Sequence, residues 1–514
     1  MPNVLTPLER TVDTLPEVPA VTDGTTRLSF EAFWDRTGRI GGGLASRGVE
    51  PGDRVALHLP NTIAYVCCLY GALRAGAVVV PINPQCRERE LHHHLADSGA
   101  TLVVTRAKDA SLAASLRDES AVKTVVSAGE HPDFETVKSL LESTPRNPIS
   151  RDEGDLAFLP YTSGTTGRPK GVELTHANVS SNAEQTAALP EGGLTTDDRM
   201  LAAVPLTHIY GLSAVVHATL ISGATLHLQE HWEPRAALRT IEEEGVTTFH
   251  GVPTMFADFV GAADADEFET SSLRFVGTGG AAMPGSLLTS VEDLLDVPVY
   301  EGYGLTETAP VTHFNRPDAH RRGSVGRALS GVAWRVVGDE FEERPPVETG
   351  PVAPDSVAEH VGEVVVAGPT VMAGYHGMPE ATAAAITERD GRRWFHTGDL
   401  GYHDENGFCY LVGRADELIV TAGYNVYPRE VEFCLTDHPA VVEAAVVGVP
   451  DERRGETVKA FVVSTPGVSV TEAELVQHCL DTLAPYKHPR ELEFVDELPR
   501  TDSGKVKRRS VGRR

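Results

Sequence analysis

One segment of the sequence combines hydroxyl groups, glycines and cations at a spacing suited to binding polyphosphate. Residues 161–171 read Tyr-Thr-Ser-Gly-Thr-Thr-Gly-Arg-Pro-Lys-Gly and follow an apolar stretch, Leu156 to Pro160. Glycines let backbone N–H groups approach phosphate oxygens, hydroxyls donate further hydrogen bonds, and Lys170 supplies a point charge. The segment is not a Walker A loop, because glycine and not Ser or Thr follows the lysine. Taken alone, such a segment is more often a flexible connection.

A second segment places a carboxylate in a glycine-rich turn. Residues 301–308 read Glu-Gly-Tyr-Gly-Leu-Thr-Glu-Thr, and a carboxylate is the expected protein ligand for a hard cation such as Mg2+. Taken alone, a residue such as Glu307 is more often a solvated acid at a helix start, and one such as Tyr303 a ring in the core. Residues 277–282, Gly-Thr-Gly-Gly-Ala-Ala, offer small side chains to a flat base or simply form a turn after a strand.

Together with other segments in the same order along the chain, these motifs resemble the adenylate-forming superfamily of acyl-CoA synthetases, peptide-synthetase adenylation domains and luciferases. The resemblance extends from about Ser29 to Arg508. It implies an α/β fold with a large N-terminal domain of stacked mixed and parallel sheets covered by helices, plus a small mobile α+β C-terminal domain. The further matching segments are Pro205–Gly211, His396–Asp399, Arg414, Thr421–Pro428 and Leu498–Lys505.

The resemblance implies ATP, Mg2+ and coenzyme A as cofactors. Tyr303 would pack on adenine, the Asp399 carboxylate would accept hydrogen bonds from the ribose hydroxyls beside Arg414, and Glu307 together with Thr166 would hold the metal. The residues expected to bind ATP are Thr162, Ser163, Gly164, Thr165, Thr166, Gly167, Lys170, Gly279, Gly280, Ala281, Glu301, Gly302, Tyr303, Gly304, Asp399 and Arg414.

Four residues are expected to be catalytic by the same resemblance. Lys505 would bridge the substrate carboxylate and the α-phosphate during adenylation, where two anions meet and a cation is strongly stabilising. Thr306 would bind the α-phosphate beside Glu307, and His208 would border the carboxylate site. A lone histidine or a lysine near a basic tail is more often structural or solvated, so these roles depend on the surrounding motifs.

A second half-reaction is implied by the segments near the C-terminus. The small domain would rotate at Asp416, and the segment containing Gly423 and Tyr424 would then guide the thiol of coenzyme A. Glycine leaves room there for a thin chain. This sequence has Ala422 where ligases of this kind commonly have the first of two glycines.

The substrate is expected to be a small carboxylic acid, most simply a medium- or long-chain fatty acid, because Gly423–Glu432 looks most like fatty-acyl-CoA ligases. An aryl acid of the coumarate or benzoate type is the alternative, while malonate ranks low because Glu301 adds an acid to the site. A non-catalytic nucleotide- or acyl-binding relative would have lost catalytic groups, and an adenylation domain serving a separate carrier protein stays open. Candidate pocket residues, several of them glycines that suggest an open cavity, are His208, Gly211, His250, Gly251, Val252, Gly279, Gly302 and Gly304.

The elements that must position these motifs are predicted by apolar periodicity. Ser29 is expected to cap a helix reaching about Arg47, and Asn61 a helix reaching Ala75, with strands at 54–59 and 77–81. Further strands at 224–228, 247–250 and 273–277 indicate parallel sheets covered by helices. The sequence pattern changes after a strand at 408–412, which predicts two domains, residues 1–412 and 413–514. The second domain is expected to contain strands at 441–449 and 458–463 and a helix at 472–483.

Composition narrows the partners. The chain has 514 residues and a formal net charge of −28, from 73 acidic against 45 basic residues, which disfavours nucleic acid and anionic membranes. Only eight of the basic residues are lysines, so the acidic surface suggests adaptation to high salt, with an ordinary acidic enzyme as the alternative. Six scattered cysteines, no leader pattern and no spanning apolar run predict a cytoplasmic protein without a transmembrane segment. The oligomeric state is left open, a homodimer included.

Overall fold

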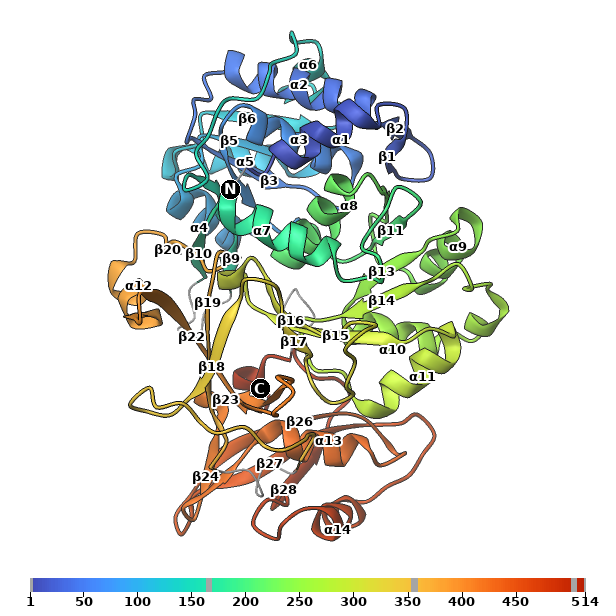
Figure 1. Cartoon of the computed structure of the whole chain (residues 1–514), viewed down its shortest axis with the longest axis vertical. Helices are drawn as coiled ribbons and strands as arrows, with labels where there is room; N and C mark the ends of the chain where they lie inside the picture. The colour runs from blue at the N-terminus through green and yellow to red at the C-terminus, as the bar shows by residue number, and fades with distance from the viewer. Residues whose placement is uncertain (1–2, 163–168, 353–358, 501–505, 513–514) are drawn as a thin grey trace.

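The computed structural model describes residues 3–162, 169–352, 359–500 and 506–512. Its strands form four sheets (Figure 1). The first two are large, and neighbouring strands run mainly parallel in both, as the alternating pattern predicts. The first sheet has the order β17-β16-β15-β14-β13-β11-β12-β1-β2. Its strands are β1 Pro19–Thr22, β2 Arg27–Ser29, β11 Arg199–Ala202, β12 Thr225–Leu228, β13 Thr248–Gly251, β14 Phe275–Thr278, β15 Val299–Gly304, β16 Val311–Phe314 and β17 Arg327–Ala328.

The second large sheet has the order β20-β10-β8-β4-β3-β5-β6-β7, and a short strand, β9, pairs with β10 outside this path. Buried apolar side chains from both large sheets and from the helices between them form one core. The strands are β3 Arg54–His58, β4 Val78–Pro81, β5 Leu102–Arg106, β6 Thr124–Ala128, β7 Glu135–Thr136, β8 Leu156–Phe158, β9 Tyr161–Thr162, β10 Lys170–Thr175 and β20 Gly374–Tyr375.

Helices cover both large sheets (Figure 1). Those of this part of the chain are α1 Thr6–Thr14, α2 Phe30–Ser46, α3 Ile63–Arg74, α4 Glu88–Ser98, α5 Ala110–Ser115, α6 Val137–Leu141, α7 His176–Ala187, α8 Ala218–Ile221, α9 Pro234–Glu244, α10 Pro253–Gly261, α11 Gly285–Leu295 and α12 Pro379–Ala385. A π-helical segment, Tyr210–His217, precedes α8. No helix in the described ranges is both long and apolar enough to cross a membrane.

The predicted cap of α2 is confirmed and that of α3 is wrong. The Ser29 hydroxyl accepts from the backbone N–H of Ala32, 3.2 Å away. At α3 the cap is Thr62, whose hydroxyl accepts from the N–H of Tyr65. Asn61 instead donates to the carbonyl of Val204 and accepts from the N–H of Leu206, both at 2.9 Å. Its amide is therefore used to hold the segment that leads into His208.

Two smaller sheets complete the fold. The third has the order β18-β19-β22-β21 with β23 paired to β22, and the fourth has the order β25-β24-β27-β26 with β28 paired to β27. The fourth packs with α13 Pro428–Thr436 and α14 Glu472–Thr482 over a separate core. The strands are β18 Ala333–Val337, β19 Gly362–Ala367, β21 Ile386–Arg389, β22 Arg392–His403, β23 Cys409–Arg414, β24 Ile419–Thr421, β25 Tyr424–Val426, β26 Val441–Asp451, β27 Gly455–Ser464 and β28 Glu491–Phe494. The mixed α/β architecture with a smaller C-terminal α+β unit confirms the predicted fold class.

Candidate active site

Three predicted residues from three different strands meet at one carboxylate. The Tyr303 hydroxyl on β15 donates to Asp399 on β22 at 2.5 Å, and Arg414 at the end of β23 donates to the other carboxylate oxygen at 3.0 Å. Arg414 also donates to the carbonyl of Thr397. Burial and the neighbouring Asp399 raise the pKa of Tyr303, so its phenol stays protonated. Each oxygen of Asp399 keeps a second lone pair with which it could accept from a vicinal diol.

Glu307 lies in the turn directly after β15 and is held by a residue that the sequence analysis missed. Its side chain is buried, and its Oε1 accepts from the Tyr375 hydroxyl at 2.8 Å. The ring of Tyr375 also lies 4.7 Å from the ammonium of Lys170. Tyr375 thereby joins the carboxylate to the end of the predicted phosphate loop. The half-buried Thr306 precedes Glu307 in the same short helical turn.

The stems of the phosphate loop are paired. Thr162 on β9 lies opposite Lys170 on β10, and Tyr161 lies opposite Gly171. The predicted residues Ser163, Gly164, Thr165, Thr166 and Gly167 lie outside the described residues, as does Lys505. The antiparallel pairing brings the two ends of the loop together.

The predicted adenine segment follows β14, next to β15. Gly279 has room for a methyl-sized group, because a Cβ placed there would make ordinary van der Waals contacts at 3.6 Å with the carbonyl of Gly302 and the ring of Tyr210. Gly280 adopts a positive φ of +81°, and a Cβ there would be 3.6 Å from Val252. Ala281, the next residue, is exposed. This segment therefore has space over Gly279.

The other candidate pocket glycines are not open. A Cβ on Gly302 would meet the ring of Phe314, and one on Gly304 would meet the carbonyl of Pro310. Gly211 and Gly251 are likewise closed, because an added Cβ would meet the carbonyl of Pro205 and the ring of Phe256, respectively. The interpretation that these glycines enlarge a cavity is wrong for these positions, since close packing of backbone and rings explains their small size.

A polar pair borders the space over Gly279. The Tyr210 hydroxyl and His250 Nδ1 are 2.9 Å apart and share a hydrogen bond. Burial lowers the pKa of His250 to about 4, so its imidazole is neutral. Gly277, opposite His250 in the sheet, is glycine because a Cβ would lie 2.7 Å from the imidazole. His208, half-buried, accepts from the backbone N–H of Tyr210 at 3.2 Å.

The small domain contributes charge to the same region. Partial burial raises the pKa of Glu301, and nearby Arg429 of α13 opposes that rise. Arg429 also lies within electrostatic reach of Asp399. Past the region of Lys505, Arg508 donates to Glu417 and Glu432, each at 2.6 Å. The chain after the predicted catalytic lysine is therefore fixed to the small domain.

The residues expected to guide the thiol are exposed. Gly423 and Tyr424 lie at the turn between β24 and β25, and the Tyr424 ring stacks on Tyr486 at 4.6 Å. Ala422 has a φ of +52°, the left-handed region that favours glycine. The backbone at Ala422 thus keeps the shape that the missing glycine would favour.

A family comparison decides what this arrangement belongs to. The family model for the AMP-binding enzyme matches residues 8–376, and that for the AMP-binding enzyme C-terminal domain matches residues 430–505. The chain belongs to the AMP-binding enzyme family. These matches confirm the predicted superfamily. Because its relatives are CoA synthetases and CoA ligases, the protein is an AMP-forming acid–CoA ligase.

The relatives differ in their acids. The ligase is 39% identical to a feruloyl-CoA synthase from Amycolatopsis sp, over 97% of this chain and 96% of that protein. It is 35% identical to a long-chain-fatty-acid–CoA ligase from Bacillus subtilis (strain 168), over 96% and 91%. Among solved structures, the anthranilate CoA ligase AuaEII in complex with anthranoyl-AMP has a TM-score of 0.90 at 27% identity, covering 99% of this chain and 96% of that one. ATP-bound MatB from Rhodopseudomonas palustris has a TM-score of 0.88 at 30% identity, covering 99% and 98%.

The residues present fit a magnesium nucleotide. A buried carboxylate whose orientation is fixed by Tyr375 is a suitable ligand for Mg2+, with phosphate oxygens and water completing the shell. Glu307 would provide that ligand, and Asp399 would hold the ribose. The bound ion would neutralise phosphate charge during the reaction.

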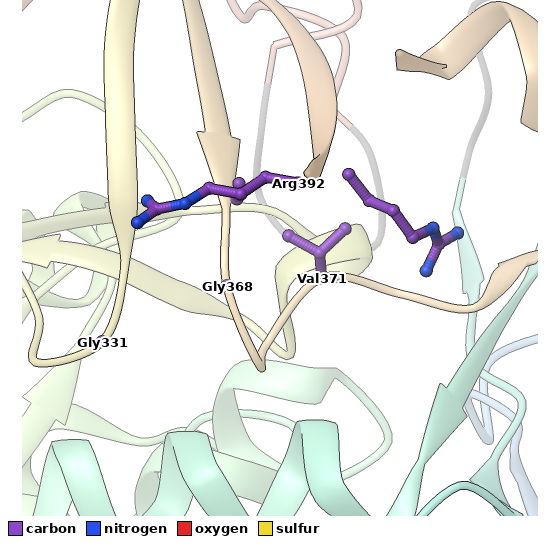
Figure 2. A pocket seen from close by; sticks show the side chains of 6 residues that line it. Gly331, Gly368, Val371 and Arg392 are labelled. Atoms are coloured by element: carbon purple, nitrogen blue, oxygen red, sulfur yellow. The ribbon is translucent and has the colours of Figure 1, made fainter. Parts of the chain in front are cut away.

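A cavity elsewhere is not built from predicted site residues. It has a volume of about 400 Å3 and lies beside the loop containing Gly368 and Val371 (Figure 2). Arg393, at its edge, donates to the carbonyls of Met372 and Ala373. The backbone N–H of Met372 in turn donates to the Glu307 carbonyl. The cavity is therefore connected through Val371 and Met372 to the turn that contains Glu307.

His396 supports the turn that presents Asp399, and it predicts a pH effect. Its Nδ1–H donates to Glu363 at 2.7 Å, and the same carboxylate accepts from the N–H of Gly398. The hydrogen bond to Glu363 raises the pKa of His396, against the opposing effect of burial. A raised folded-state pKa stabilises the protein below the unfolded value of about 6.5, and this contribution disappears as pH rises through the folded value.

We therefore expect the difference in free energy of unfolding between wild type and His396→Gln to be larger at about pH 5.5 than at about pH 8.5. Denaturant unfolding of both proteins across this range measures the difference. A constant difference would contradict the prediction, because it would mean that the imidazole titrates alike in folded and unfolded chains.

Proposed function

We propose that this ligase activates an aromatic carboxylic acid bearing a polar ring substituent, of the hydroxycinnamate kind, as its acyl-adenylate and then transfers the acyl group to coenzyme A. The observation that supports the acid class is the Tyr210–His250 pair beside Gly279. The Tyr210 hydroxyl oxygen lies 3.7 Å from the point where a Gly279 Cβ would sit, so it borders the space over that residue.

The chemistry of this pair favours a polar acid. In the arrangement where the Tyr210 hydroxyl donates to Nδ1, neutral His250 carries its proton on Nε2, and the phenol oxygen keeps acceptor capacity. A substrate hydroxyl can donate to the phenol oxygen, whereas an alkyl chain would leave that acceptor without a second hydrogen bond. The 39% identity to feruloyl-CoA synthases agrees with this preference.

A fatty acid is the second candidate. It is favoured by the fatty-acyl-like segment Gly423–Glu432 and by the 35% identity to the Bacillus subtilis (strain 168) ligase. The two acids would use the same nucleotide site and would differ only in the pocket over Gly279.

In the proposed first step, a carboxylate oxygen of the acid attacks the α-phosphorus of ATP, a new P–O bond forms, and the bond to the β-phosphate oxygen breaks as pyrophosphate leaves. Asp399 and Arg414 orient the ribose, which fixes the α-phosphate relative to the acid. Lys505 and Lys170 neutralise the charge that gathers on the phosphates. His208 borders the carboxylate, and no residue becomes acylated.

In the proposed second step, the small domain rotates at Asp416 and the thiolate of coenzyme A attacks the acyl carbonyl. A thioester forms and the bond to AMP breaks. Gly423 and Tyr424, exposed in the present arrangement, would then border the pantetheine chain.

Tyr210→Phe tests the acid class. Removing one hydroxyl is expected to lower kcat/KM for 4-coumarate by about 10-fold, because one hydrogen bond to the substrate is lost. Cinnamate, which lacks the ring hydroxyl, serves as the matched substrate and should be unaffected. Pyrophosphate release and acyl-CoA formation are measured for both acids, with decanoate and palmitate in parallel, at low and high KCl because the charge of −28 predicts salt dependence.

Two outcomes count against the aromatic assignment. Equal losses with coumarate and cinnamate would show that Tyr210 does not contact the ring hydroxyl. A wild-type preference for palmitate over both aromatic acids would support the fatty-acid candidate.

A further inference from the structure

Helix α4 touches both stems of the phosphate loop. His93 Nε2–H donates to the carbonyl of Pro169 at 3.0 Å, and Asp97 accepts from the Tyr161 hydroxyl at 2.7 Å. Tyr161 immediately precedes Thr162, and Pro169 immediately precedes Lys170. The two bonds therefore lie on opposite sides of the loop, at its entry and its exit.

The geometry of the helix allows one face to make both contacts. His93 and Asp97 are four residues apart, so their side chains lie on the same face of α4. His94 adds a ring contact, with its centroid 4.6 Å from that of Tyr161. Helix α4 lies beside β9 and β10 in Figure 1, in agreement with these contacts.

Of the two stems that α4 contacts, β10 is part of the second sheet and β9 has fewer backbone partners. β9 is only two residues long and pairs with β10 alone, outside the main path of its sheet. A short strand with one neighbour contributes few backbone hydrogen bonds. The contacts from α4 therefore add side-chain support to a strand that has one backbone neighbour.

The protonation states suit lasting hydrogen bonds. Burial and the bond to Asp97 raise the pKa of Tyr161, so its hydroxyl remains a donor. Burial, together with the charge of His93, lowers the pKa of His94 to about 4, so the ring beside Tyr161 stays neutral.

We propose that His93 and Asp97 form a clamp, the α4 clamp, which sets the separation of the two stems and so positions the phosphate loop for pyrophosphate. They are positioning residues, since they act through Tyr161 and Pro169 and do not touch the nucleotide. The inference depends on the proposed use of the loop for the phosphates of ATP, and it is independent of the identity of the acid. Its sequence signal is weak, because neither residue belongs to a motif.

The test compares a disruptive and a conservative pair of variants. In His93→Ala/Asp97→Ala both bonds are lost, and we expect the KM for ATP to rise by about 10-fold or more and pyrophosphate to weaken as a product inhibitor by a similar factor. In His93→Gln/Asp97→Asn the amide N–H and the amide oxygen can replace the lost donor and acceptor, so the KM for ATP should return toward the wild-type value. The KM for the acid should stay unchanged in both.

Two controls separate positioning from simple loss of folding. His92→Ala removes the adjacent histidine, which instead faces the backbone carbonyl of Glu119, and it should leave the KM for ATP unchanged. Tyr161→Phe removes a single oxygen atom and is expected to raise the KM for ATP as well. It provides the test if the alanine pair fails to fold. Destabilisation alone would lower the active fraction and hence kcat, without changing one KM selectively.

The clamp would be overturned if the alanine pair or, should that pair not fold, Tyr161→Phe kept the wild-type KM for ATP and the wild-type inhibition by pyrophosphate. It would also be overturned if the conservative pair behaved like the alanine pair. Failure of the proposed function is distinguishable, because then the wild type itself would release no pyrophosphate with any acid.

Discussion

Asp399→Ala is expected to raise the KM for ATP by about 100-fold, with a smaller change in the KM for the acid. The carboxylate accepts from Tyr303 at 2.5 Å and from Arg414 at 3.0 Å, and it would also accept from the ribose. Alanine removes the acceptor for the diol and leaves the guanidinium of Arg414 with its longer contact to Asp416 in place of the one to Asp399. Both effects act on nucleotide binding, so pyrophosphate release as a function of ATP concentration measures them, and calorimetric titration with ATP checks affinity directly.

The chain offers a matched control five residues further along. Asp404 also accepts from a tyrosine and an arginine, namely Tyr410 at 3.0 Å and Arg321, and it is buried. Asp404→Ala should therefore lower the melting temperature without changing the KM for ATP. If Asp399→Ala behaved in the same way, the role of Asp399 would be structural and the ribose assignment would be wrong.

The sequence motifs identified residues that converge from two different sheets, since β14 and β15 belong to the first sheet and β22 and β23 to the third. Thr278 and Glu301 are neighbours in the paired strands β14 and β15, and Asp399 lies opposite Arg414 in the pairing of β22 with β23. Strand periodicity predicts such strands, although it does not predict which ones pair. The convergence followed from the family order of the motifs and not from periodicity alone.

Contacts between distant side chains were not predictable from a single sequence. Tyr375 holds Glu307 from 68 residues away, and Asp97 holds Tyr161 from 64 residues away. Nothing local distinguishes these side chains from solvated ones, because their partners are set by the packing of whole elements.

Two errors in the sequence interpretation have physical causes. Asn61 and Thr62 are both good caps, and the tertiary bonds of Asn61 to Val204 and Leu206 decided between them. Gly302 and Gly304 are small because Phe314 and Pro310 lie against them. A glycine in a motif thus indicates that another group lies close to its backbone. That group can belong to the protein itself as readily as to a ligand.

Lys505→Ala is expected to separate the two half-reactions. Pyrophosphate release from ATP and acid should fall by about 10²–10³-fold, the cost of removing a group that neutralises developing charge in the transition state. Formation of acyl-CoA from chemically prepared acyl-adenylate and coenzyme A should stay close to wild type, because Lys505 is proposed to leave the site before that step. Rapid-mixing measurements of each half-reaction give the two rates separately.

Lys507→Ala is the matched control, since it removes an exposed cation only two positions away and should leave both half-reactions unchanged. The comparison is sharp in this chain because lysines are rare, eight in 514 residues with a net charge of −28. A cation stabilises two anions strongly only when it lies close to both of them. At about 4 Å, the energy of this charge–charge interaction depends strongly on the exclusion of water. Arg508, three residues further along the chain than Lys505, is anchored to Glu417 and Glu432. Equal losses in both half-reactions, or a Lys507→Ala defect as large as that of Lys505→Ala, would show that the lysines act through general charge and not through a catalytic position.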